Sequence, residues 1–302
     1  NALSDKLVVQ VKRDGKQYEM TFAHGEKLSD LKEIGEARKR DTGTSVRCWP
    51  ESKYFDSDKF SINQLKHVLR AKAVLCSGLS VSFTHVGKSE KETWCFEDGI
   101  KDYLCGALVD VPRLPEKKPF MGHFVTDDGE VDWAICWTPE HNPLIQESYV
   151  NLIPTAQGGT HVSGFRQGLL NAMREFCDMH KLLPRGIKLT PEDLWGNAQY
   201  VLSAKIHEPQ FSGQTKERLS SRQCAAFVSG VASDAFSLWL NHHVEAGKAI
   251  AEVVVGNAQT RSRTSKKVIR KSVAVGPALP GKLADCISRE PEQGELFLVE
   301  GD

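Results

Sequence analysis

Three segments of this sequence carry side chains that could contact phosphate or hold a divalent cation. The first, Pro209–Ser221 (PQFSGQTKERLSS), contains Gln214 and Lys216. Its proline and glycine predict a loop between two regular elements. A lysine held there is a compact positive charge with three donors, which suits a phosphate oxygen. The alternative is a solvated loop lysine, because most lysines are exposed and have no further role.

The second segment is the apolar stretch Glu295–Asp302 (ELFLVEGD), which ends in two carboxylates. We expect a strand that delivers Glu300 and Asp302 to a loop, with Gly301 between them. Carboxylate oxygens are hard ligands of the kind that Mg²⁺ prefers. Such sites often lie at the carboxyl ends of strands in open α/β sheets. The alternative is a polar turn, because this spacing alone is weakly specific.

The third segment is a basic run. Between Val253 and Ala284 there is no acidic residue, although the whole chain has 39 basic and 39 acidic residues and no net charge. A local patch of this kind predicts contact with a phosphate backbone. No aromatic residue lies among the bases, which favours duplex over single-stranded nucleic acid. The alternative is a solvated linker. The bases are Arg261, Arg263, Lys266, Lys267, Arg270, Lys271 and Lys282.

The length and composition of the chain limit the classes of protein to which it can belong. With 302 residues, 40% apolar and 26% charged, the chain is long enough for about two globular domains. Its eight cysteines form no CxxC pair and several lie in apolar runs, which predicts reduced, buried thiols in a cytosolic protein. No apolar run has membrane-spanning length and no signal peptide opens the chain. Both ends look cut, so we expect an internal fragment of a larger protein.

The first part of the chain predicts mainly strands. Two β-rich runs, Leu7–Arg13 and Gln17–Phe22, flank Asp14-Gly15, a strong hairpin signal. Residues 110–119 hold three prolines and little apolar content, which favours a domain boundary there. The other elements expected in this part are a strand at Thr42–Trp49, a helix at Phe60–Ala73 and a hairpin at Val81–Phe96.

The second part alternates strands with helices, which predicts an α/β or α+β domain. Thr190 can cap a short helix that has Pro191 at its first position and Asp193 at its third. The longest helical pattern starts near Ser221 and continues to Ala258, with Gly247 as the place for a bend. The other expected elements are strands at Phe120–Thr126, Val131–Trp137, Ser148–Ile153 and Tyr200–Ile206, and a helix at Val162–Met179.

Several segments occur in the same order in the ATPase subunits of bacterial type IIA topoisomerases. They are TGTSVRCWP, SYVNLIPTAQGGTHVSGFRQGLL, PQFSGQTKERL, GPALPGKLADC and ELFLVEGD. The chain resembles this family along essentially its whole length. The segment SYVNLIPT, and Gln157 before GGTH, resemble the topoisomerase IV branch. The gyrase branch typically has an acidic residue before GGTH.

The resemblance implies an α+β multidomain fold. Residues 1–112 would be the C-terminal part of a GHKL (Bergerat) ATPase domain. Residues 113–260 would form a transducer similar to domain 2 of ribosomal protein S5, and residues 261–302 a basic linker and the start of a Toprim domain. His161, Gly158 and Gly159 are interpreted as structural turn residues without a chemical role.

The same resemblance implies roles for the candidate residues. Lys216 matches the lysine that reaches the γ-phosphate of ATP, and Gln214 matches the glutamine beside it. Thr44 matches a threonine that hydrogen-bonds near the adenine. Glu300 matches the first acidic residue of the Toprim fold, which ligates Mg²⁺ or acts as general acid/base in DNA cleavage. Asp302 would face the cleavage site, and Lys282 lies in a segment that borders the DNA gate.

The implied function is ATP-dependent passage of duplex DNA, with ATP and Mg²⁺ as cofactors. The implied partners are duplex DNA, a DNA-cleaving partner subunit in a heterotetramer, and a second copy that dimerises through a region before Asn1. The expected location is the bacterial cytoplasm, at the nucleoid. The fragment alone is expected to be inactive. Two other interpretations stay open: a GHKL protein of the mismatch-repair or chaperone type, and a non-catalytic module that clamps DNA.

Overall fold

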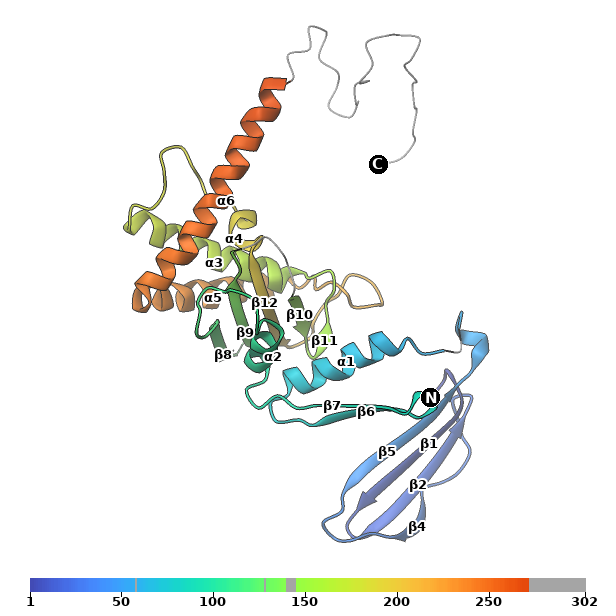
Figure 1. Cartoon of the computed structure of the whole chain (residues 1–302). Helices are drawn as coiled ribbons and strands as arrows, with labels where there is room; N and C mark the ends of the chain where they lie inside the picture. The colour runs from blue at the N-terminus through green and yellow to red at the C-terminus, as the bar shows by residue number, and fades with distance from the viewer. Residues whose placement is uncertain (58, 128, 140–144, 272–302) are drawn as a thin grey trace, which may run out of the picture. The chain divides into compact units, whose positions relative to one another are not determined.

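The chain forms two compact units, Asn1–Gly99 and the part from Ile100 onward, which are described here one at a time. The computed structural model describes residues 1–57, 59–127, 129–139 and 145–271 (Figure 1). The division precedes the proline-rich segment 110–119, where the sequence favoured a boundary. The reason is α2 (Ile100–Ala107), a helix that the sequence pattern did not predict and that packs against the sheet of the second unit.

The first unit opens with a five-stranded sheet in the order β3-β2-β1-β5, with β4 also paired to β2. Asp14 and Gly15 both have positive φ, 53° and 79°, so they form the expected tight turn between β1 and β2. The expected strand near Thr42–Trp49 is present as β5. The strands are β1 (Ser4–Arg13), β2 (Lys16–Ala23), β3 (Glu26–Lys27), β4 (Lys32–Glu36) and β5 (Gly43–Pro50).

The rest of the first unit, within its described residues, is one α-helix, one hairpin and two short 3-10 helices, and the sequence predicted the α-helix and the hairpin. Helix α1 packs against β6, which pairs antiparallel with β7. Its buried side chains, Ala71, Ala73 and Val74, lie in its last turns. The elements are η1 (Ser52–Tyr54), α1 (Ile62–Leu75), β6 (Val81–His85), η2 (Val86–Lys88) and β7 (Glu90–Trp94).

The second unit is built on a sheet in the order β11-β10-β12-β9-β8. Its pairs are antiparallel except β10 with β12, which are parallel. A parallel pair needs a crossover, and here the crossover contains α3 and α4. The strands are β8 (Phe120–Thr126), β9 (Gly129–Trp137), β10 (Gln146–Val150), β11 (Ile153–Pro154) and β12 (Ala198–Ile206).

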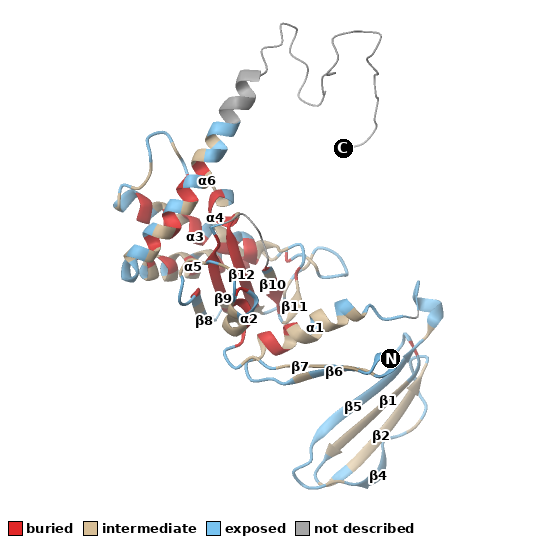
Figure 2. Ribbon diagram, viewed as in Figure 1, coloured by how far each residue is buried: buried red, intermediate tan, exposed pale blue. Residues whose placement is uncertain are grey.

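Helices α3, α5 and α6 bury the apolar side chains of this sheet in one core (Figure 2). Phe120 of β8 lies 4.9 Å from Phe236, and Trp133 of β9 lies 5.4 Å from Phe165, measured between ring centroids. The helices are α3 (Thr160–Met179), α4 (Pro191–Trp195), α5 (Arg222–His242) and α6 (Val244–Lys271).

The long C-terminal helical pattern is two helices, and it breaks at His243 instead of bending at Gly247. His243 has φ −126° and ψ 53°, outside the helical region. Gly247 instead permits close packing, because a Cβ there would lie 2.8 Å from Phe176 and 2.9 Å from Leu240. Helix α6 continues to Lys271, so residues 261–271, expected as a linker, are helical.

Candidate functional site

The predicted phosphate-contacting loop joins β12 to α5 and stands out from the second unit. Its two legs pair with each other: Ser212 donates its N–H to the Arg218 carbonyl at 2.9 Å, and Ser220 donates to the Gln210 carbonyl at 2.8 Å. The tip between the legs holds Gln214 and Lys216, which are both exposed. The loop is therefore a supported projection with a cation at its end.

The backbone at the tip is unusual. Lys216 has φ +59°, in the left-handed region that non-glycine residues rarely adopt, and Gly213 has φ +85°. Within the part of the chain that the structure describes, the Lys216 ammonium has no hydrogen-bond or ion-pair partner. An unpaired, exposed ammonium on a supported tip can bind an anion without first breaking an internal contact.

Thr44, the residue assigned to the adenine end of a nucleotide, lies in the first unit. It is an exposed residue of β5 and pairs with Val11 of β1. The structure thus brings Gln214 and Lys216 together on one loop and places Thr44 in the other unit.

Arg261, assigned to DNA from the basic run, makes internal contacts that the sequence did not predict. Its Nε and Nη2 donate to the two carboxylate oxygens of Asp193, both at 2.9 Å, and Nη2 also donates to the Lys188 carbonyl at 2.9 Å. This two-point pair fixes α6 to the start of α4. Arg263 is likewise exposed but, among the described residues, has no ion pair of this kind.

Asp193 also takes part in the cap of α4, for which the sequence predicted Thr190 as the capping residue and Asp193 as the third helical residue. Its carboxylate accepts the backbone N–H of Thr190 at 2.7 Å and the Thr190 hydroxyl at 2.9 Å, which confirms the predicted capping arrangement. Burial is the largest influence and opposes ionisation. The Arg261 guanidinium and the Thr190 donors together outweigh it and hold the pKa of Asp193 below its usual value.

The remaining candidates lie C-terminal to Arg263 in the sequence. Lys266, Lys267, Arg270 and Lys271 fall in the last turns of α6, where the described part of the chain is the helical backbone alone. Lys282, Glu300 and Asp302 lie outside the described residues.

His161 lies in the first turn of α3, and its surroundings give it a structural role. It is fully buried, and its Nε2 lies 3.1 Å from Thr155 Oγ1, which in turn lies 2.7 Å from Ser148 Oγ. Burial lowers the pKa of His161 to about 4, so the ring is neutral near pH 7. The expectation of no chemical role fits this environment.

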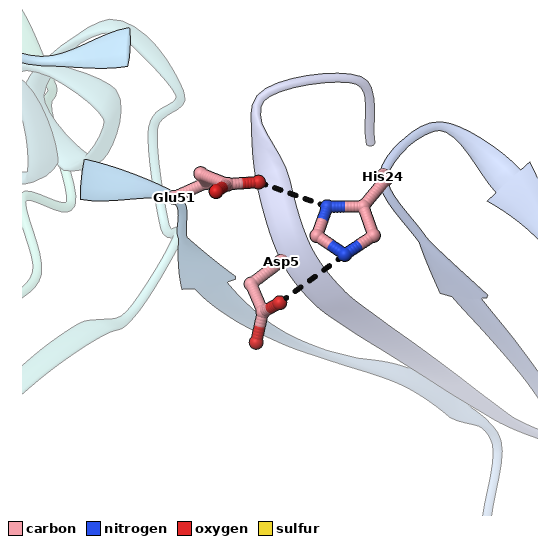
Figure 3. A group of neighbouring side chains, drawn as sticks. All are labelled: Asp5, His24 and Glu51. Carbon is pink, nitrogen blue, oxygen red and sulfur yellow. Dashed lines mark hydrogen bonds and ion pairs between the residues drawn. The ribbon is translucent and has the colours of Figure 1, made fainter. Parts of the chain in front are cut away.

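Asp5, His24 and Glu51 form a cluster of possible metal ligands in the first unit (Figure 3). The Nδ1 atom of His24 lies 2.8 Å from Glu51, whereas its Nε2 lies 3.4 Å from Asp5. The two nitrogens are on opposite edges of the ring, so one ion cannot use both. Lys53 also pairs with Glu51 at 3.1 Å. This group is a set of polar contacts near the surface that joins β1, the end of β2 and the end of β5.

A second cluster, His123, Glu130 and Asp132, lies on β8 and β9. Here the Nδ1 of His123 contacts Asp132 and lies 3.9 Å from Glu130. Lys205 of β12 places its ammonium 2.6 Å from Glu130, where a metal ion would sit near this carboxylate. The cluster therefore already contains its cation.

The described cysteines only partly match the expectation of buried thiols. Cys136, Cys177 and Cys224 are buried, and burial raises their pKa values to about 12, 11 and 11. These thiols stay protonated and unreactive near pH 7. Cys48 and Cys95 are exposed, because their strand and loop lack a covering layer among the described residues.

Comparison with known proteins gives the chain a family. The sequence pattern described as DNA gyrase B matches residues 99–269, which is more than half of the chain. The chain belongs to the DNA gyrase B family. Its relatives include the B-subunit of DNA topoisomerase 4 from Pseudomonas aeruginosa, 61% identical, and that from Escherichia coli, 57% identical, over all 302 residues. The chain spans about half the length of these relatives, 48% of each.

Solved structures of the DNA gyrase B family confirm the α+β fold. The topoisomerase IV ATP-binding domain of Francisella tularensis, solved with a small-molecule inhibitor, is 39% identical. It superposes with a TM-score of 0.71 over 86% of this chain and 70% of that one. The 43K ATPase domain of Thermus thermophilus gyrase B, solved with an aminocoumarin, is 28% identical, with a TM-score of 0.71 over 89% and 72%. Among the described residues, none of the helices is long and apolar enough to cross a membrane.

Proposed function

We propose that the chain is part of the ATPase subunit of a bacterial type IIA DNA topoisomerase. In the whole protein, ATP binding and hydrolysis would drive the passage of one DNA duplex through a break in another. The identity of 57–61% with the B-subunit of topoisomerase 4, across the full chain, supports this class of enzyme. The observation that carries the assignment is the unpaired Lys216 ammonium at the tip of a supported loop.

Lys216 suits the stabilisation of charge during phosphoryl transfer. Bound ATP supplies a γ-phosphate whose oxygens gain or redistribute negative charge as its bond to the leaving group breaks. A preorganised ammonium aimed at those oxygens lowers the barrier, because its orientation does not have to be found during the reaction. Gln214, exposed on the same tip, has an amide that can donate to the same phosphate. We assign Thr44 to the adenine end of the nucleotide.

The second unit would transmit the state of that contact. The Lys216 loop leads directly into α5, and α5 packs closely against α3. At this contact, a Cβ on Gly164 would lie 2.3 Å from the carbonyl oxygen of Ala225, so the two helix backbones nearly touch. A displacement of the loop would move both helices together. This is a two-state element that a nucleotide could bias.

The DNA-facing end would begin with α6. We propose that Arg263 and the basic residues after it contact the DNA backbone, and that Glu300 holds Mg²⁺ at the site of DNA cleavage. Arg261 would support these DNA contacts indirectly, because its pair with Asp193 fixes the position of α6. The proposed assembly contains two copies of this chain, duplex DNA and the DNA-cleaving partner subunit, in the bacterial cytoplasm. Relaxation of supercoiled DNA by the reconstituted assembly tests the overall reaction.

The decisive test of the ATPase role is Lys216→Ala in the whole protein. Because one preorganised donor is lost, we expect kcat for ATP hydrolysis to fall about 100-fold or more, with a smaller loss of nucleotide affinity. Lys181→Ala is a matched control, because Lys181 is also an exposed lysine with left-handed backbone, φ +55°. Normal ATP hydrolysis by Lys216→Ala would refute the assignment.

A further inference from the structure

The leg of the loop that follows Lys216 is bound to the segment before α3. Gln157 donates its backbone N–H to the Glu217 carbonyl at 3.0 Å, and Leu219 donates to the Gly158 carbonyl at 3.1 Å. Thr160 then donates to the Leu219 carbonyl at 3.1 Å. These bonds form a short parallel bridge between Gly159 and Leu219. One side of the loop is therefore paired with the N-terminus of α3.

Steric contacts make this bridge tight. Gly159 has φ +137°, and a Cβ there would lie 2.4 Å from the Leu219 carbonyl oxygen and 2.5 Å from its nitrogen. Only glycine allows such an approach. The Leu219 side chain is 1% exposed and belongs to the core of the second unit. Both sides of the bridge are thus fixed: Gly159 by close packing and Leu219 by the burial of its side chain in the core.

A side-chain contact extends the bridge to the residue next to Lys216. The Gln157 Nε2 donates to the Glu217 carboxylate at 2.7 Å, although the two residues are 60 positions apart. Together with the backbone bond, this contact holds Glu217 at two points. On the other side of the tip, a Cβ on Gly213 would meet nothing within 4 Å. Lys216 therefore lies between Gly213, which has free space around it, and Glu217, which two hydrogen bonds hold in place.

We propose that Gln157 is a positioning residue for Lys216. Its carboxamide holds Glu217 and so maintains the left-handed backbone of Lys216, which a free chain would leave for more stable regions. This backbone sets the direction in which the ammonium leaves the tip. The contact also links the loop to α3, so that the position of the lysine and the position of the helix change together. The proposal rests on the proposed role of Lys216.

The experiment compares Gln157→Ala with Gln167→Ala in the whole protein. Gln167 is also exposed and donates its amide to Asn171 at 2.7 Å, but it lies on α3 itself. For Gln157→Ala we expect kcat for ATP hydrolysis to fall about fivefold, the factor for one typical hydrogen bond at an exposed position, with KM nearly unchanged. Gln167→Ala should keep the parent kcat. Equal kcat in all three proteins, or an equal loss in both variants, would overturn the proposal.

An exchange of side chains separates positioning from a general effect on folding. Gln157→Glu places two carboxylates in contact and should lower kcat about tenfold or more, because like charges repel. The double variant Gln157→Glu with Glu217→Gln restores a donor and an acceptor, and should return kcat to within about twofold of the parent. A double variant as slow as Gln157→Glu would refute the link. Lys216→Ala is assayed alongside. Normal ATP hydrolysis by Lys216→Ala would refute the proposed function. Normal ATP hydrolysis by Gln157→Glu would refute only the positioning role of Gln157.

Discussion

The two five-stranded sheets of this chain differ in what covers them. In the sheet of the first unit, Ser4 is the one buried residue between Asn1 and Pro50. In the sheet of the second unit, β9 and β12 are buried along most of their length. Figure 2 shows the contrast as tan and pale blue strands in one unit and mainly red strands in the other. Similar strand numbers therefore give very different cores.

The difference lies in the layers, not in the strands. Val46 and Trp49 of β5 are β-forming residues, yet they are 61% and 40% exposed. Comparable residues of β9, such as Ile135 and Trp137, are fully buried, because α3 and α5 cover them. Apolar area removed from water is what stabilises a sheet. The second unit thus contains its own source of stability, whereas the first sheet has little apolar burial within the described residues.

The largest expected effect comes from removing a core ring in the second unit. Phe236 is fully buried and contacts both Phe120 and Trp137. We expect Phe236→Ala to lower the free energy of unfolding by about 3–5 kcal/mol, through lost burial and a cavity. Val46→Ala, in the open sheet, should change it by less than about 0.5 kcal/mol. Denaturant unfolding followed by tryptophan fluorescence measures both, and similar losses would contradict the comparison.

The next effect tests the close contact between α3 and α5. A Cβ on Gly164 would meet the Ala225 backbone, so Gly164→Ala must push the helices apart, at a cost of about 1–3 kcal/mol. Gly230 lies on α5 with nothing within 4 Å of such a Cβ. Gly230→Ala should therefore stabilise the protein by up to about 1 kcal/mol, through helix propensity alone. Thermal unfolding of the two variants should move in opposite directions.

Local signals in the sequence predicted the elements that depend on neighbouring residues. Asp14-Gly15 gave the first hairpin, and Thr190 with Asp193 gave the start of α4. Pro209 and Gly213 correctly placed Lys216 in a loop. The break at His243 carried no proline or glycine signal, and α2 is too short for a clear period.

Contacts between distant residues could not be predicted in the same way. Arg261 and Asp193 are 68 positions apart, and neither residue's surroundings in the sequence indicate the other. The basic run therefore suggested a DNA contact for Arg261, whereas the fold directs its guanidinium to a carboxylate. The pairing of Gln157 with Glu217 is of the same kind. Charge patterns show which residues can bind an anion, and tertiary packing decides which anion they meet.

Arg261 and Arg263 make a matched pair for this distinction. Arg261→Ala leaves the Asp193 carboxylate, 2% exposed, without its cation, and should cost about 1–3 kcal/mol of stability. Arg263→Ala should cost almost none. Under the proposed function, Arg263→Ala instead weakens duplex DNA binding and lowers its salt slope by about 1. Denaturant unfolding and DNA titrations at several salt concentrations separate the two roles, and reversed results would refute this division.

The same pair predicts how stability depends on pH. Because the pKa of Asp193 is lowered in the folded protein, its ionised form contributes stability above the unfolded pKa of about 4. That contribution is lost as the pH falls through the lower, folded value. In Arg261→Ala the main cationic partner is gone, so the folded pKa of Asp193 rises, and the stability of this variant should fall less than that of the parent protein as the pH falls. Unfolding curves between pH 7 and 3 measure this difference, and parallel curves for both proteins would contradict it.

The smallest effect concerns the contacts of His24 with Asp5 and Glu51 in the first unit. His24 and Asp5 are exposed, with side-chain exposures of 55% and 65%, so His24→Ala should cost at most about 1 kcal/mol and less at high salt. His123→Ala removes a similar histidine–carboxylate contact from the well-packed unit and is the matched control. Amide hydrogen exchange in β1 and β8 measures local opening for each variant. A clearly larger effect for His24 would mean that the open sheet depends on surface ion pairs because apolar burial within it is small. Equal small effects would mean that the His24 contacts add little to the strand pairing between Ser4 and Pro50.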